Sequence, residues 1–133
     1  MNKLTGIIIK IQKSGAVMLI DVDVDGHRFS ALLIESGLKQ PWLVEGNKVD
    51  LVFKETEVSL ARGLKGIIST RNRMMCKVTG VERGELLSKI TLSFQENTLV
   101  SAITTRAADS LQIHVGEEIE ALVKANEVAL MQK

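Results

Sequence analysis

The chain has 133 residues, a mass of 14.6 kDa, 45% hydrophobic and 25% charged residues, and a formal net charge of +1. This length accommodates one ordinary domain or two very small ones. The near-neutral charge argues against general nucleic-acid binding, which needs a basic patch. Three Phe, one Trp and no Tyr also provide few surfaces on which bases could stack.

The apolar runs in the sequence indicate where in the cell the protein is located. They are too short to span a bilayer, and the run near the N-terminus is interrupted by Lys10, unlike a secretory signal. We therefore expect a cytoplasmic protein with no membrane partner. Cys76 is the only cysteine, which excludes an internal disulfide, and its strand-like surroundings predict a buried thiol.

Alternating apolar residues predict antiparallel strands at the start of the chain. Ile7, Ile9 and Ile11 form the apolar face of a first strand, and residues 20–24 form a second. The Asp25-Gly26 pair predicts a tight turn into a third strand.

A short helical turn is predicted at residues 35–43, before Gly46 and a final pair of strands. Trp42, which follows a proline, is expected to be a packing anchor at a contact between copies or subunits. His27 is expected to be a turn residue, since it has no Cys or His partner at the spacing of metal ligands.

The remaining elements repeat the first ones. Residues 45–60 align with residues 115–130 without a gap, so the chain is a tandem duplication. Upstream, residues 20–32 align with residues 90–103 if the hairpin turn of the second copy is one residue longer. A second helical turn is predicted at residues 106–114.

Two small barrels are the fold that this pattern predicts. Five short strands with one helical turn per copy describe a Greek-key barrel of the OB type, so the fold class is all-β with two such barrels in tandem. The predicted boundaries are residues 1–66 and 67–133. Because a barrel of this size buries too little apolar surface to be stable alone, we expect the copies to pack together and against other chains.

The second copy resembles the Mop (molybdate-binding) domain family. The resemblance lies in "ISTRNRM" at residues 68–74 and "VKANEV" at residues 123–128, which occur in the order and spacing of the family's motifs. It implies kinship with the molbindins, cytoplasmic trimers or hexamers with OB-like (TOBE) domains that hold molybdate or tungstate between subunits. It also implies a homo-oligomer, of which a trimer is the expected form.

The donors expected at such a site suit a tetrahedral dianion, which has four acceptor oxygens and needs compensating positive charge. Arginine can donate two N–H groups in parallel, and lysine supplies a compact charge. From the resemblance and from this chemistry, the predicted oxyanion-binding residues are Ser69, Thr70, Arg71, Asn72, Thr104, Lys124, Ala125 and Asn126. Two of the family's hydroxyl positions are changed, since Asn126 replaces a Thr and Ala107 replaces a Ser.

The first copy departs from this set. Met1 aligns with Arg71, so the printed sequence holds no counterpart of Ser69, and Glu55 stands where Ala125 does. In this alignment Leu33 stands where Thr104 does. A carboxylate beside an anion-binding lysine repels a dianion. We therefore expect the first copy to be a structural partner, with Lys54 and Thr56 as secondary contributors to a site completed elsewhere.

The predicted function is non-enzymatic binding of molybdate or tungstate for storage or homeostasis, without catalytic residues, a bare metal site or an organic cofactor. Three alternatives stay open. The chain could be the sensing module of a molybdate-responsive transcription factor or transporter, acting through a partner. It could be an OB-type binder of single-stranded nucleic acid. Finally, Arg71, Arg73 and Lys124 could be solvated charges on a linker and an edge strand.

Overall fold

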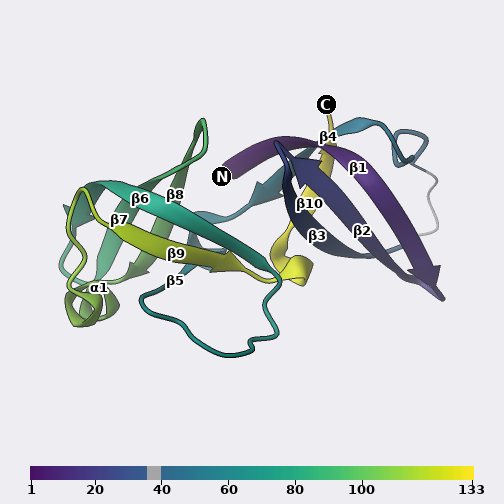
Figure 1. Cartoon of the computed structure of the whole chain (residues 1–133). Helices are drawn as coiled ribbons and strands as arrows, with labels where there is room; N and C mark the ends of the chain where they lie inside the picture. Colours follow the sequence, from purple (N-terminus) through teal and green to yellow (C-terminus); the bar gives the residue numbers. More distant parts are fainter. Residues whose placement is uncertain (36–39) are drawn as a thin grey trace.

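Ten β-strands form two curled sheets in the computed structural model, which describes residues 1–35 and 40–133 (Figure 1). The elements are β1 (Asn2–Ser14), β2 (Val17–Val24), β3 (His27–Ile34), β4 (Lys48–Phe53), η1 (Glu55–Glu57), β5 (Ser59–Ala61), β6 (Asn72–Arg83), β7 (Leu87–Phe94), β8 (Asn97–Thr104), α1 (Thr105–Leu111), β9 (Glu118–Val123), η2 (Ala125–Glu127) and β10 (Ala129–Gln132). The predicted class, two tandem OB-like barrels, is confirmed.

Each sheet takes one strand from the other half of the chain. The strand orders are β10-β4-β1-β2-β3 and β5-β9-β6-β7-β8, so β10 lies in the first sheet and β5 in the second. Figure 1 shows β10, in yellow, beside the strands of the N-terminal half. This differs from the expectation that residues 1–66 and 67–133 each close a barrel of their own.

Two short 3₁₀ turns produce this exchange. At η1 the N–H of Glu57 bonds the carbonyl of Lys54, and at η2 the N–H of Glu127 bonds the carbonyl of Lys124. Each turn is followed by a valine, Val58 or Val128, whose side chain is almost fully buried. Burial of these apolar side chains stabilises the crossing of each strand to the opposite sheet.

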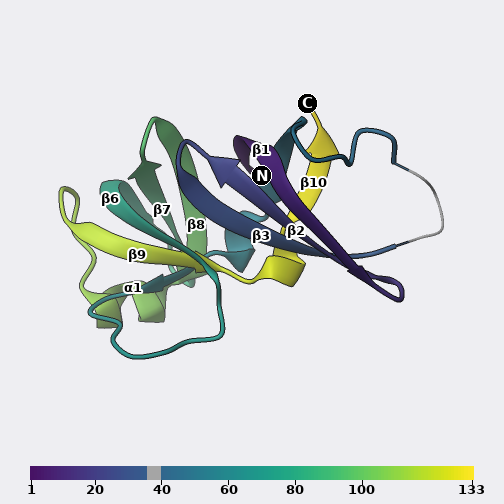
Figure 2. The same cartoon turned by 45° about the vertical axis from the view of Figure 1, so that its right-hand side comes forward.

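One hydrophobic core runs through both halves. The buried residues form a single cluster that includes residues of both sheets. At the junction the rings of Phe29 and Phe94 are 6.0 Å apart in an edge-to-face arrangement, which aromatic pairs favour. Figure 2 shows the two sheets side by side; across their junction β3 contacts β6, and β1 contacts β8. The packing of the two copies against each other, expected from their size, is thus observed.

Two buried asparagines, Asn72 and Asn2, join the halves through equivalent hydrogen bonds, which we call the asparagine clasp. The side chain of Asn72 donates to the carbonyl of Ser30 at 2.8 Å and accepts from its N–H at 2.7 Å. Asn2, its counterpart, forms the same two bonds with Val100, each 2.8 Å long. A carboxamide side chain carries both N–H donors and a carbonyl acceptor, so it satisfies both backbone groups of an edge-strand residue.

The two copies align more simply than their sequences suggest. Both β2–β3 and β7–β8 are joined by two residues, Asp25-Gly26 and Gln95-Glu96. The predicted extra residue in the second turn is therefore wrong. Ile34 pairs with Val17 as Thr104 pairs with Leu87, so Ile34, rather than Leu33, is the counterpart of Thr104.

The apolar face of β1 also differs from the prediction. Leu4 and Ile8 are buried, whereas Ile7 and Ile9 are 43% and 41% exposed. A bulge between Ile8 and Lys10 shifts the pairing of β1 with β2 by one residue, which changes the alternation of faces along the strand. A period of two read from the sequence cannot locate such a bulge.

The helical turn of the second copy is confirmed as α1. Thr104 caps it by accepting the N–H of Ala107 at 3.1 Å, and Gln112 ends it in the left-handed region. In the first copy, residues 36–39 of the turn predicted at 35–43 lie outside the described residues. No helix is present in the described part of that segment.

Other expectations concern single residues. Cys76 is buried as predicted, and burial raises the pKa of its thiol to about 12. Trp42 is partly buried and packs against the shared hydrophobic core, and its predicted place at a contact between copies or subunits stays a prediction. Within residues 1–35 and 40–133, no helix is long and apolar enough to cross a membrane, and no group of three or more metal-ligating side chains occurs.

The linker between β5 and β6 is anchored where it begins. Arg62 donates through Nη1 to Glu117 at 2.8 Å and through Nη2 to the carbonyl of Leu111 at 2.8 Å. Glu117 also accepts the N–H of His114 at 2.6 Å. These bonds lower the pKa of Glu117 to about 2, with the Arg62 hydrogen bond as the largest cause.

The asparagine clasp can be tested with Asn72→Ala. This change leaves the two backbone groups of Ser30 without their partners, and each such group costs about 1 to 3 kcal/mol, so the free energy of unfolding should fall by roughly 2 to 6 kcal/mol. Asn47→Ala, which removes an exposed amide, is the control and should cost less than about 0.5 kcal/mol. Urea unfolding measures both, and equal losses would contradict the clasp.

The hydrogen bonds between Arg62 and Glu117, which anchor the linker, predict that the stability of the protein depends on pH. The folded pKa of Glu117, about 2, lies below the unfolded value, so its contribution to stability is complete above the unfolded pKa and is lost as the pH falls through about 2. Glu117→Gln should therefore be less stable than the wild type near neutral pH, and the difference should shrink in acid. Urea midpoints over that range measure it, and a difference that does not change with pH would refute the anchor.

Candidate functional site

Strand pairing brings the two predicted motifs together. β6 and β9 are antiparallel, with Asn72 opposite Val123. The start of β6 therefore adjoins the end of β9, so that Ser69–Arg71 and Lys124–Asn126 flank the same end of the second sheet. Although the motifs stand at opposite ends of the repeat in sequence, they are neighbours within one chain.

A pocket of about 370 Å³ lies at this end of the sheet. It is lined by Thr56, Glu57, Ser59, Leu60, Ala61, Leu64, Ile68, Thr70, Leu122, Lys124 and Glu127. Two of the predicted residues, Thr70 and Lys124, are among them. Ser69, Arg71, Ala125 and Asn126 adjoin these two in sequence and are not part of the lining.

The first half contributes to this pocket through Thr56. Because β5 crosses to the second sheet, the η1 turn that precedes it lies against β8 and beside Lys124. Thr56, predicted only as a secondary contributor, thus shares a pocket with Thr70. Lys54, the other predicted contributor, is exposed and does not line it. The sequence carries no signal of the strand exchange, so this combination could not be predicted from it.

The charges around the pocket are mixed. Lys124 is exposed, and the lining also holds the carboxylates of Glu57 and Glu127. Arg71 is exposed, and its guanidinium donates to the carbonyl of Ile68. Within the described part of the chain, neither Arg71 nor Lys124 forms an ion pair. Both cations can therefore reach an anion, but in one chain the two carboxylates offset their charge.

Asn72 does not face the pocket. Its side chain is 1% exposed and is fully engaged with the backbone of Ser30. Within one chain its side-chain amide is therefore engaged and does not line the pocket, and its role in binding an oxyanion stays a prediction. Its position directly after Arg71 instead ties the predicted binding segment to the first sheet.

Thr104 lies at the other end of the second sheet. It pairs with Leu87 and caps α1, because β8 runs in the same direction as β6 and ends far from where β6 begins. There it lines a separate pocket of about 620 Å³ that also contains Arg83, Arg106 and Asp109. Within one chain, Thr104 and Lys124 therefore lie at separate pockets, and the prediction that both bind an oxyanion stays a prediction.

The family of the second half is evident from comparison with known proteins. Residues 68–130 match the TOBE domain family. The "Molybdenum import ATP-binding protein ModC" of Brucella abortus (strain 2308) is 37% identical over 108 residues, which cover 80% of this chain and 28% of that protein. The chain thus spans less than a third of the length of this relative.

Two further proteins resemble the chain. The "Molybdenum-pterin-binding protein MopB" of Rhodobacter capsulatus is 30% identical over 108 residues, covering 80% of this chain and 40% of MopB. The solved structure of the cytoplasmic molybdate-binding protein ModG, with molybdate bound, superposes with a TM-score of 0.91 at 23% identity, over 99% of this chain and 96% of ModG. This last likeness establishes a shared fold. Residues 68–130 therefore belong to the TOBE domain family, and the whole chain shares the fold of ModG.

Proposed function

We propose that the chain binds molybdate or tungstate in the cytoplasm, at the pocket between η1, β5 and β9. The names of ModC, MopB and ModG support this ligand class, since all three refer to molybdenum or molybdate. The observation that carries the proposal is the grouping of Thr56, Thr70 and Lys124 in one pocket, with Arg71 beside it.

These residues supply the donors that a tetrahedral oxyanion needs. Each threonine offers one hydroxyl proton, Lys124 offers three N–H donors, and Arg71 offers a planar pair. Charge-assisted hydrogen bonds of this kind are stronger than neutral ones. Ser69 and the backbone N–H of Ala125 adjoin these residues in sequence and complete the proposed donor set, together with Asn126.

A second copy completes the site in this proposal. The carboxylates of Glu57 and Glu127 offset Lys124 and Arg71, so a dianion bound by one chain alone would remain under-neutralised. The Thr104 end of the second sheet carries the Arg106 guanidinium. Supplied by a neighbouring copy, these groups add a hydroxyl and a positive charge. A homotrimer is the arrangement that we propose.

The role that we propose is binding without catalysis, for storage or homeostasis of the oxyanion. A second candidate is a regulatory module that senses the same ion for a transporter. The similarity to ModC favours it, because the matched part of ModC belongs to a larger import protein. No comparable observation favours an OB-type nucleic-acid binder.

Substitution of the two equivalent lysines tests the site. Lys124→Ala should weaken molybdate binding by about 2 to 5 kcal/mol, as expected for one member of a charged hydrogen-bonded pair. Lys54→Ala, its matched control in the first copy, should cost less than about 1 kcal/mol. Thr56→Val should cost about 0.5 to 1.5 kcal/mol, the net value of one hydrogen bond. Isothermal calorimetry with molybdate and tungstate measures all three variants.

Other ligands provide the controls for this titration. Sulfate, phosphate and a short oligonucleotide should give little or no heat with the wild type, since fixed donors favour an oxyanion of matching size. Two results would contradict the site: equal losses for Lys54→Ala and Lys124→Ala, or a wild-type value for Thr56→Val. Binding of the oligonucleotide alone would refute the proposed function.

The proposed oligomer has a mass that can be measured. Light scattering at micromolar concentration should give three times the chain mass, with and without molybdate. If the site is shared between chains, a mixture of Thr104→Ala and Lys124→Ala proteins should regain part of the binding after subunit exchange, because some sites then combine two intact halves. A monomeric mass, or no recovery in a mixture shown to have exchanged, would overturn the shared site.

A further inference from the structure

His27 reaches across the junction to the segment that carries the candidate site. Its Nε2 lies 2.9 Å from the carbonyl oxygen of Arg73, and because a carbonyl only accepts, this nitrogen carries the proton and donates. The imidazole lies against Phe29 of its own half, at 5.3 Å between centroids, and against Phe94 of the other half, at 5.2 Å. The expectation of a simple turn residue is thus incomplete.

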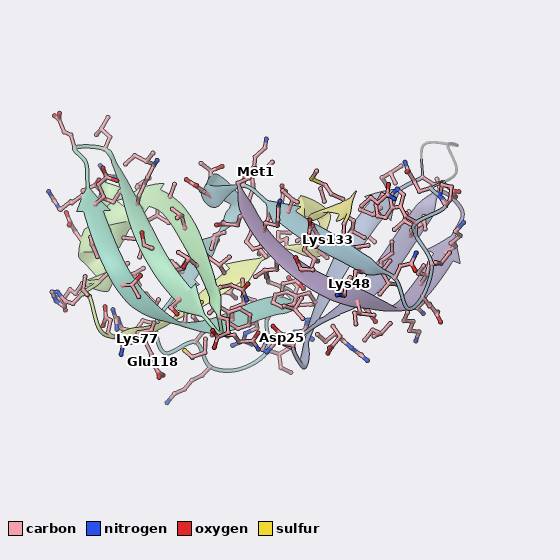
Figure 3. All side chains as sticks on the ribbon, turned by 90° about the horizontal axis from the view of Figure 1, so that it is seen from above. Met1, Asp25, Lys48, Lys77, Glu118 and Lys133 are labelled. Atoms are coloured by element: carbon pink, nitrogen blue, oxygen red, sulfur yellow. The ribbon has the colours of Figure 1, made fainter. Side chains whose placement is uncertain are left out.

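The bond from His27 joins a set of contacts around the start of β6. Asn72 is held by Ser30, and the guanidinium of Arg73 bonds Glu120 of β9 at 2.6 and 3.0 Å. Figure 3, in which Asp25 marks the turn just before His27, shows this hairpin in the middle of the molecule between the two sheets. Residues 72 and 73 are thereby fixed from both sheets, directly after Ser69, Thr70 and Arg71.

The matching place at the other junction lacks this contact. Asn97 is the counterpart of His27, and its amide bonds the carbonyl of Phe94 within its own turn, at 3.3 Å. The asparagine clasp is present at both junctions, so it serves the assembly of the halves. The histidine contact occurs only at the junction where the strand begins after Ser69–Arg71. This difference links it to the binding segment rather than to the fold in general.

We propose that His27 is a positioning residue for the oxyanion site. This inference rests on the proposed function of that site. By holding the carbonyl of Arg73, it fixes the direction in which β6 begins and thus where Arg71 and Thr70 stand relative to Lys124. Preorganised donors bind an anion more tightly than donors that must be ordered on binding. The imidazole reaches the site only through the backbone and makes no contact with the ion.

The test compares three variants. His27→Asn introduces the residue found at the equivalent place, His27→Gln keeps an N–H donor on a longer side chain, and Asn97→Ala is the control at the other junction. Two quantities are measured for each variant: amide hydrogen exchange of residues 69–73 without ligand, and the Kd for molybdate. Thermal unfolding verifies that each variant is folded.

His27→Asn should speed exchange in residues 69–73 and raise the Kd by up to about tenfold, the effect of losing one net hydrogen bond. His27→Gln should recover most of both losses, and Asn97→Ala should leave both unchanged. Wild-type exchange and Kd in folded His27→Asn would overturn the proposal, as would an equal effect of Asn97→Ala. If the wild type binds no molybdate, the proposed function fails, and the exchange readout alone then decides whether His27 positions the segment.

Discussion

The exchange of β5 and β10 between the two sheets joins the two halves into one folded unit. It makes each barrel incomplete without the other half, so that the core is continuous and the halves cannot separate without opening both sheets. Asn2 and Asn72 reinforce this arrangement by satisfying the edge of the opposite sheet. Two repeats that would each be marginal in size thereby share one larger core.

The same exchange determines where chemistry can occur. It carries Thr56 from the first half to the pocket that contains Thr70 and Lys124. The first repeat therefore contributes a side chain to the lining of this pocket. The two junctions are related by the duplication but differ in their side chains, with His27 at one and Asn97 at the other. The duplicated junctions have thus diverged: His27 donates across one of them to Arg73, and Ser101 donates across the other to the carbonyl of Val58.

Much of this fold could be predicted from the sequence because the patterns that determine it are local. Alternating residues, the Asp25-Gly26 turn and the gapless repeat predict strands, a hairpin and two OB-like copies. The bulge near Ile8 and the exchange of β10 could not be predicted, since neither produces a local pattern in the sequence. For the site, chemistry indicated Lys124 and Thr70, but the separation of Thr104 depends on strand direction, which motif spacing does not reveal.

We propose that an oxyanion binds where the strand exchange joins the two halves. The most direct measurement is the anomalous diffraction of tungsten in crystals grown with tungstate. We expect a tungsten peak within hydrogen-bonding distance of Thr70 and Lys124, with the Thr56 hydroxyl facing it. Tungsten peaks that all lie away from Thr70 and Lys124, at an occupancy showing that the ion is bound, would contradict it.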